Sequence, residues 1–329
     1  MGLWAAIVSM AVSFAVLARS ADWLVEGAVG VAQRLKVSAM VIGIVIVSMG
    51  TTAPELAVSM QAALAGEPEI ALGNAVGSVI YDDGLALPLV ALFSPVVVVI
   101  DRFVLRYTAI FLIAVDLVAY WLCLDGVLSQ REGVLLVLGF FGYLAYTYRV
   151  RSRTRAEDTE TKEDQSKEEE PKRWGRISFL FLLGLAGVLV SSELIVISAP
   201  MLAKAAGVSN TIIGLAVIAF GTSVPEIATC IAAARRRQGG LAVGNILGAD
   251  ILNICWIAGA SATVNDLIVA RADIHFMFPS MIVIVGVMLA LLRLNYRFEK
   301  WKGGVLLLLC VLYLIALWIK TPDSVQPFA

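Results

Sequence analysis

The sequence predicts an all-α polytopic membrane protein with ten transmembrane helices in two inverted five-helix repeats. Three observations support this prediction: the composition, a pair of duplicated motifs, and the unequal distribution of basic residues between the loops. The chain of 329 residues is 60% hydrophobic and only 16% charged, and its mean hydropathy is +0.87. A soluble core could not bury so much apolar surface, so most of the chain is expected to lie in a bilayer.

Long uncharged runs, extended across glycine, proline and isolated acids, predict ten spans, each of which reaches the length of about 17–25 residues that crosses the hydrocarbon core. The first and sixth spans are longer than a perpendicular crossing needs, which indicates tilt. The first is interpreted as a mature helix rather than a signal peptide, because it lacks a basic n-region and its helical spacing continues. The predicted limits are 3–31, 37–63, 69–95, 104–124, 131–149, 175–203, 209–233, 240–264, 273–293 and 302–320.

A hydrophilic segment joins the two halves. Its central run, Glu157–Glu170, has mixed charge and no apolar residue, so it cannot pack a core. We interpret the segment as a charged, disordered cytoplasmic linker; the alternative, a regulatory ion sensor, lacks the spaced oxygen ligands and glycine turn of a calcium-binding loop. The predicted organisation is a first repeat at 1–149, a linker at 150–174, a second repeat at 175–320 and a tail at 321–329.

Basic residues are concentrated on one side of the predicted membrane, which the positive-inside rule assigns to the cytoplasm. Both termini then lie outside and the linker lies in the cytoplasm. Because each half has an odd number of helices, the second half enters from the opposite side. Outside the central run, the basic side carries Arg34, Lys36, Arg102, Arg106, Arg235, Arg236, Arg237, Arg293, Arg297, Lys300 and Lys302, whereas the other side carries only Arg131, Lys204, Arg271 and Lys320.

A motif that breaks a helix occurs once in each half. Gly50–Glu55 reads Gly-Thr-Thr-Ala-Pro-Glu, and Gly221–Glu226 reads Gly-Thr-Ser-Val-Pro-Glu, at an offset of 171 residues (226 − 55). Proline cannot donate a hydrogen bond to the preceding turn, so carbonyls around Ser48–Thr51 need other partners in a medium without water, and a cation can supply them. Hydroxyl, carbonyl and carboxylate oxygens are the ligands that Na⁺ and Ca²⁺ prefer. The candidate ligands here are Ser48, Thr51, Thr52, Glu55, Thr222, Ser223 and Glu226.

A second duplicated segment, Gly73–Ser78 and Gly244–Ala249, follows at the same offset. Its paired glycines, four residues apart, let two helix backbones approach closely. Polar residues then recur at i, i+4 and i+8, on one face of each helix. They are Asn74, Ser78 and Asp82 in the first half, matched by Asn245, Ala249 and Asn253 in the second.

Small residues and amides also hold membrane helices together without any ion, and this alternative explains the glycines and one asparagine. It does not explain Glu55, Glu226 and Asp82, because a carboxylate in a membrane helix costs about 2.5–3.5 kcal/mol on insertion scales. Asp83 and Asp250 are further acids, each about 100° around the helix from the ligand face, and are either supporting ligands or packing groups. Asp116, outside both motifs, either pairs with a neighbouring helix, lies near the membrane interface or borders the ion path.

The two linked motifs, repeated in two halves around an acidic loop, resemble the calcium/cation antiporter superfamily, and within it the chain is most similar to prokaryotic sodium/calcium exchangers. The resemblance covers everything except the central loop and the tail. It implies that the second, third, seventh and eighth helices enclose the ions at mid-membrane. It also implies that the paired glutamates, Glu55 and Glu226, and the paired hydroxyl steps, Thr51–Thr52 and Thr222–Ser223, are ion ligands.

The family's Gly-Ser-Asn-x-x-Asn/Asp ending is altered in both halves. Here Gly77–Asp82 reads Gly-Ser-Val-Ile-Tyr-Asp, and Gly248–Asn253 reads Gly-Ala-Asp-Ile-Leu-Asn. Exchangers of the family often carry asparagine in the first repeat and aspartate in the second, and this chain has the reverse. Ala249 also lacks a hydroxyl that the family uses on one sodium site. The acid count is kept, but these departures leave the ion preference open, calcium selectivity most of all.

We therefore predict a secondary antiporter, not an enzyme, that exchanges Na⁺ for Ca²⁺ by alternating access, because inverted repeats around a shared site suit that mechanism. A K⁺-dependent or H⁺-coupled exchanger is the alternative, and a passive cation channel would favour a continuous pore lined by rings of like residues. No nucleotide loop, zinc motif or nucleophile elbow occurs, so no cofactor is expected beyond the transported ions. The expected partners are Ca²⁺, Na⁺ and the lipid bilayer, without nucleic acid, and the expected setting is a monomer in the inner (plasma) membrane of a prokaryote.

Overall fold

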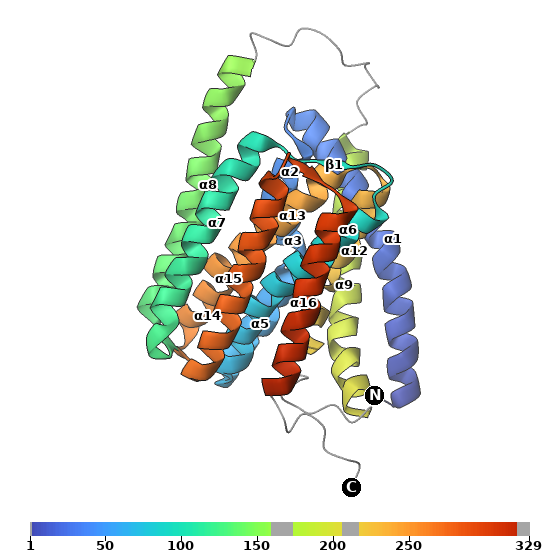
Figure 1. Cartoon of the computed structure of the whole chain (residues 1–329). Helices are drawn as coiled ribbons and strands as arrows, with labels where there is room; N and C mark the ends of the chain where they lie inside the picture. Colours follow the sequence, from blue (N-terminus) through green and yellow to red (C-terminus); the bar gives the residue numbers. More distant parts are fainter. Residues whose placement is uncertain (1, 159–173, 206–216, 321–329) are drawn as a thin grey trace.

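The computed structural model describes residues 2–158, 174–205 and 217–320 and shows a bundle of helices (Figure 1). The first helix, α1 (Leu3–Leu35), begins at the same end of the bundle at which the last, α16 (Lys300–Lys320), finishes. At the opposite end α8 (Gln130–Asp158) finishes and α9 (Trp174–Ala205) begins. Each half of the chain therefore starts at one end of the bundle and finishes at the other.

The helices confirm a polytopic membrane fold. Among the described residues, seven helices are long and apolar enough to cross a membrane, and a bent pair, Ala39–Thr51 with Ala53–Ala65, raises the number to eight. The two other predicted spans are accounted for differently. The fifth predicted span corresponds to α8, which continues to Asp158 instead of ending at 149. The first part of the seventh predicted span, 209–216, lies outside the described residues. The predicted tail and the part of the linker at 159–173 also lie outside them.

Several spans that the sequence predicts as single helices are interrupted. The second bends by 45° at Thr52, and π-helical turns, which often mark functional sites, begin at Asp82 and Leu252 in the third and eighth. The second span comprises α2 (Ala39–Ile42), the π-helical turn η1 (Gly43–Val47), α3 (Ser48–Thr51) and α4 (Ala53–Ala65). The third comprises α5 (Pro68–Tyr81), η2 (Asp82–Ala86) and α6 (Leu87–Phe93). The described part of the seventh is α11 (Ala219–Thr222) and α12 (Val224–Arg235), and the eighth comprises α13 (Gly239–Ile251), η5 (Leu252–Ala258) and α14 (Gly259–Val264).

Two short antiparallel strand pairs connect the halves. One pairs β1 (Val98–Val99), which precedes α7 (Arg102–Leu122), with β4 (Arg297–Phe298), between α15 (Arg271–Arg293) and α16. The other pairs β2 (Val127–Leu128), which follows α7 and the short turn η3 (Cys123–Asp125), with β3 (Leu267–Ile268), before α15. By their order among the helices, β1 in the first half corresponds to β3 in the second, and β2 corresponds to β4. The β1–β4 pair and the β3–β2 pair are therefore the same contact, with the roles of the two halves exchanged.

Burial divides the helices into a centre and a periphery. Each span contains an apolar stretch of 18 residues. Of this stretch 94% is buried in the Gly239–Val264 span and 78% in the Pro68–Phe93 span, but only 22% in α1. These two central spans carry the second duplicated motif. On the periphery, α1 packs antiparallel against α9, and the backbone of Gly27 is in contact with Phe181.

The glycines of the second half of the duplicated motif allow the close approach that the sequence predicts. A Cβ atom on Gly244 would collide with the backbone carbonyl of Met40, and one on Gly248 would collide with the carbonyl of Ile44. On the other side of this contact, Gly43 of the second span lies against the backbone of α13. The broken second span and α13 are therefore in direct backbone contact beside the predicted ligands.

We expect Gly244→Ala to destabilise the protein by about 1–3 kcal/mol, because the added methyl group has no room and must displace backbone. Gly240→Ala, one turn earlier on the same helix, is the matched control, since its Cβ would lie 4.0 Å from the Met40 side chain, an ordinary contact. The melting temperature of the purified protein measures both. Equal melting temperatures for the two variants would show that this contact does not constrain the helices.

Candidate ion-binding site

The two helix breaks have the same local geometry. Thr52 separates α3 from α4 with φ −79° and ψ 6°, and Ser223 separates α11 from α12 with φ −80° and ψ 0°. In each case proline follows within the first turn of the new helix, where its missing N–H causes no loss. Glu55 and Glu226 occupy that same first turn. Each motif therefore folds into a short helix end, a hydroxyl-bearing corner and a glutamate.

Hydrogen bonds connect each break to the asparagine of the other half. The hydroxyl of Thr51 donates to Asn245 Oδ1 at 3.3 Å, and the hydroxyl of Thr222 donates to Asn74 Oδ1 at 3.0 Å. These two bonds are equivalent under the sequence offset of 171 residues (222 − 51 and 245 − 74). The predicted ligand residues of the two halves therefore converge on one region of the bundle.

Some predicted ligands are occupied by protein contacts. The carbonyl of Ser48, which the sequence suggests is freed by the break, accepts from the Thr52 N–H at 2.9 Å and from the Thr52 hydroxyl at 2.8 Å. The Ser48 hydroxyl donates to the Ile44 carbonyl at 2.5 Å. Asn74 Nδ2 donates to the Glu55 carbonyl at 3.2 Å and to Ser59 Oγ at 2.9 Å. The Ser48 carbonyl is satisfied because the residue four positions later is Thr52, whose N–H and hydroxyl both donate to it. The carbonyl that loses its helical donor to Pro54 is that of Gly50.

The carboxylates behave differently. Glu55, Asp82 and Glu226 are 0% exposed, and neither oxygen of any of the three has a hydrogen-bond partner among the described residues. Glu55 is close enough to Glu226 and Asp82 to repel both electrostatically, and Asp82 is similarly close to Glu226. The hydroxyls of Thr222 and Thr51 lie beside Glu55 and Glu226, respectively. Three buried, mutually repelling and unpartnered acids need a cation or protons to become stable in a membrane interior.

A second group of acids lies next to the first. Asp83 and Asp250 are also buried and near one another, and Asp116 from α7 interacts with both. The structure therefore brings Asp116 to the acids of the duplicated segment, where the sequence left its role open. Within the described ranges, no three acidic, histidine or cysteine side chains converge tightly enough to hold a metal ion by themselves. Hydroxyl, amide or carbonyl oxygens would have to complete any coordination shell.

All the predicted ligand residues are buried. Ser78 Oγ lies 3.5 Å from the Thr222 hydroxyl, whereas Ser223 Oγ and both polar side-chain atoms of Asn253 have no partner among the described residues. Sequence reasoning missed Ser59, which accepts from Asn74; its position one turn after Glu55 on α4 was the available signal. The buried set is Ser48, Thr51, Thr52, Glu55, Asn74, Ser78, Asp82, Asp83, Thr222, Ser223, Glu226, Asn245, Asp250 and Asn253.

Comparisons with known proteins agree with this arrangement. The sequence model of the family described as "Sodium/calcium exchanger protein" matches residues 5–149 and 177–319. An uncharacterized membrane protein of Methanocaldococcus jannaschii is 33% identical over 296 residues, which cover 90% of this chain and 91% of that protein. The sodium/calcium exchanger MaX1 of Methanosarcina acetivorans is 28% identical over 333 residues, which cover 92% of this chain and 95% of MaX1.

The fold is similar to that of a solved exchanger. A structure of the sodium-calcium exchanger NCX_Mj soaked with Na⁺ and Sr²⁺ matches with a TM-score of 0.80 at 27% sequence identity, covering 96% of this chain and 99% of that chain. The family match extends over both halves and includes both helix breaks and both asparagine-bearing helices. The chain belongs to the sodium/calcium exchanger protein family.

Proposed function

We propose that this protein is a secondary antiporter that exchanges Na⁺ for Ca²⁺ by alternating access. The observation that carries the proposal is the group of unpartnered, fully buried carboxylates of Glu55, Asp82 and Glu226, contributed by both halves. Ca²⁺ takes six to eight oxygen ligands, often including carboxylates, and Na⁺ is a hard cation of the same preference. A site that accepts either ion but not both at once converts the gradient of one into movement of the other.

The proposed ligands differ in what they supply. Glu55, Glu226 and Asp82 supply charge, and Asn253 and Ser223 supply neutral oxygens that have no other partner among the described residues. Asp83 and Asp250 border this group and are proposed as supporting acids. The remaining proposed ligands are already hydrogen bonded in the protein and would orient the others or bind through a second lone pair: Ser48, Thr51, Thr52, Asn74, Ser78, Thr222 and Asn245.

We infer that the architecture is ten helices in two inverted five-helix repeats. Three features support the inference: the equivalent threonine–asparagine bonds, the equivalent strand pairs, and the opposite directions in which the halves traverse the bundle. Such repeats support transport because two near-equivalent halves can exchange conformations around one site, opening it to each side in turn. The proposed setting is a monomer in the inner membrane of a prokaryote, with both termini outside and the linker cytoplasmic.

Proteoliposomes loaded with Na⁺ and diluted into Na⁺-free medium are expected to accumulate radioactive Ca²⁺, with K⁺ and pH equal on both sides. The Na⁺ gradient alone drives this uptake if one site serves both ions. Vesicles with equal Na⁺ on both sides are the control and should retain only background Ca²⁺.

Other outcomes would identify other mechanisms. Uptake that requires K⁺ or a pH gradient would contradict simple sodium coupling and indicate the K⁺-dependent or H⁺-coupled alternative. Ca²⁺ flux that is independent of the Na⁺ gradient, with no stimulation by Ca²⁺ inside the vesicle, would indicate a channel and overturn the antiporter.

A further inference from the structure

An apolar groove runs between α1 and α12. Its cavity volume is about 230 Å³, and it is lined mainly by side chains without charge, among them Phe14 and Ala18 on α1 and Ala228 and Ile231 on α12. Groove-lining residues at both ends of α12, Val224 and Arg235, show that it follows the whole helix. Its polar lining is limited to one end, where Asp22 and Arg235 face it.

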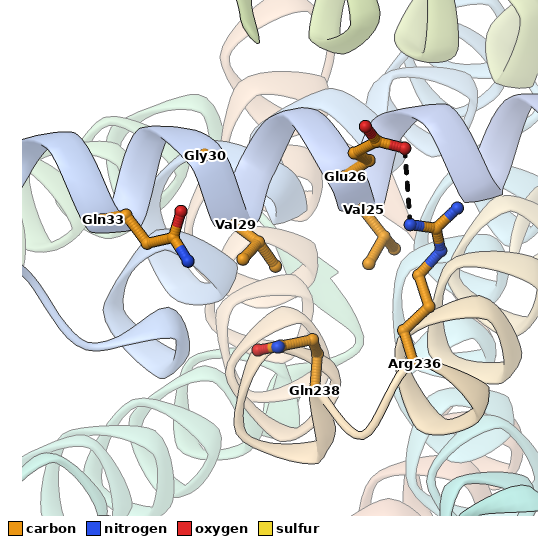
Figure 2. Close-up of a pocket in the computed structure, with 7 residues that line it drawn as sticks. All are labelled: Val25, Glu26, Val29, Gly30, Gln33, Arg236 and Gln238. Atoms are coloured by element: carbon orange, nitrogen blue, oxygen red, sulfur yellow. Dashed lines mark hydrogen bonds and ion pairs between the residues drawn. The ribbon is translucent and has the colours of Figure 1, made fainter. Parts of the chain in front are cut away.

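The same strip of α1 becomes polar beyond that end. Arg236 Nε lies 3.3 Å from Asp22 Oδ1, and its Nη1 lies 3.5 Å from Glu26 Oε2. Figure 2 shows the next hollow, of about 300 Å³, in which Glu26 and Arg236 meet and the amides of Gln33 and Gln238 lie along the wall. A change from apolar to polar lining is expected where the hydrocarbon of a bilayer gives way to lipid headgroups.

The dimensions of the groove match one leaflet. The 12 residues of α12 extend roughly 18 Å at 1.5 Å per residue. Half of a hydrocarbon core of about 30 Å is about 15 Å. The groove therefore extends from the level of the helix break to the headgroup level of one leaflet, which is the reach of a single acyl chain.

Three arginines and two acids meet at the polar end: Arg235, Arg236 and Arg176, whose Nη2 lies 3.4 Å from Glu26 Oε1, against Asp22 and Glu26. Arg236 is paired with two acids, but Arg235, which lines the groove and is exposed, has no acidic partner among the described residues. Arg237 is exposed too, but it does not line the groove. Guanidinium groups bind phosphate through paired, charge-assisted hydrogen bonds, and basic pockets between membrane helices recognise anionic headgroups.

We propose that this groove binds an anionic phospholipid, with one acyl chain between α1 and α12 and the phosphate at Arg235. The occupant lies between the peripheral helix α1 and the helix that carries Glu226. The groove shares no lining residue with the proposed ion ligands, although it begins at Val224, next to Ser223. The proposal does not depend on which ions are exchanged.

Native mass spectrometry of the full-length protein tests this with phosphatidylglycerol and phosphatidylcholine of identical acyl chains. Wild-type protein is expected to retain phosphatidylglycerol with an affinity about tenfold or more above that for phosphatidylcholine. Arg235→Gln is expected to remove this preference. Arg237→Gln, next in the chain but outside the groove, is the matched control and should keep it.

A second variant tests the acyl-chain part of the site. Ala228→Phe places a ring in the groove and is expected to reduce retention of both lipids; Ala18→Phe fills the groove from the opposite wall and serves if the first variant does not fold. Unchanged lipid retention in the folded groove-filling variants, or an unchanged preference in Arg235→Gln, would overturn the proposal. Wild-type protein that carries no bound phospholipid would also overturn the proposal. This holds whether a second copy of the protein, seen as a dimer, or another segment of the chain fills the groove instead.

Discussion

Proteoliposomes that carry Glu226→Gln are expected to show no sodium-driven Ca²⁺ uptake above the background of empty vesicles, and Glu55→Gln is expected to have the same effect. Glutamine preserves the shape of the side chain but removes the charge that faces the cation. Breaking a buried charge pair costs about 3–5 kcal/mol, which corresponds to a loss of ion affinity of at least about 100-fold. Both residues are fully buried at equivalent helix breaks, so neither can be replaced by solvent.

Glu69→Gln is the matched control for these variants. Glu69 also lies in the first turn of a helix, α5, but it is exposed and outside the site. It should retain wild-type uptake. A size-exclusion profile and melting temperature close to wild type must accompany the loss of transport in the other two variants. Near-normal uptake by both would show that the paired glutamates are not ligands.

Asp82→Asn is expected to impair Ca²⁺ transport far more than Na⁺ binding. Coulombic attraction scales with the charge of the ion, so a divalent cation loses about twice as much as a monovalent one when a carboxylate is removed. Asp82 is fully buried, close to Glu226, and its oxygens have no hydrogen-bond partner among the described residues. Ca²⁺ uptake and the Na⁺ concentration that half-inhibits it measure the two effects.

Asn253→Asp in the same chain restores the charge from the opposite half. Asn253 is equivalent to Asp82 by the sequence offset (253 − 82 = 171) and is buried with both polar side-chain atoms unpartnered. We expect the double variant to recover part of the Ca²⁺ uptake that Asp82→Asn loses. Full activity in the single variant would show that Asp82 is not a ligand. An inactive double variant beside an inactive single variant would show that the position of the charge, and not its amount, matters there.

Much of this arrangement can be predicted from the sequence because the bilayer removes alternatives. Few carboxylates are tolerated in membrane helices, so Glu55, Glu226 and Asp82 were identifiable as functional candidates, and all three are buried. Proline at a fixed place in each motif predicted the helix breaks, because it removes a backbone donor. The family and the helical membrane fold followed from the same motifs and composition, and both are confirmed.

Features that depend on packing between helices could not be predicted in this way. The π-helical turns at Asp82 and Leu252 depend on how neighbouring backbones approach, and the approach of Asp116 to Asp83 depends on the rotation of α7 about its axis. Local hydrogen bonding likewise determines that the Ser48 carbonyl is satisfied by Thr52. The end of α8 was placed too early because charged residues were interpreted as linker, although Arg, Glu and Ala are all good helix formers.

The equivalent threonine–asparagine bonds also affect biogenesis. A ribosome releases the first half of the chain to the membrane before the second half is synthesised. During that interval Thr51 lacks Asn245 and Asn74 lacks Thr222, so the polar groups of the first half must find temporary partners such as water, lipid headgroups or the insertion machinery. A nascent chain that ends after α8 therefore cannot form either bond, and both become possible only after α11 and α13 are inserted.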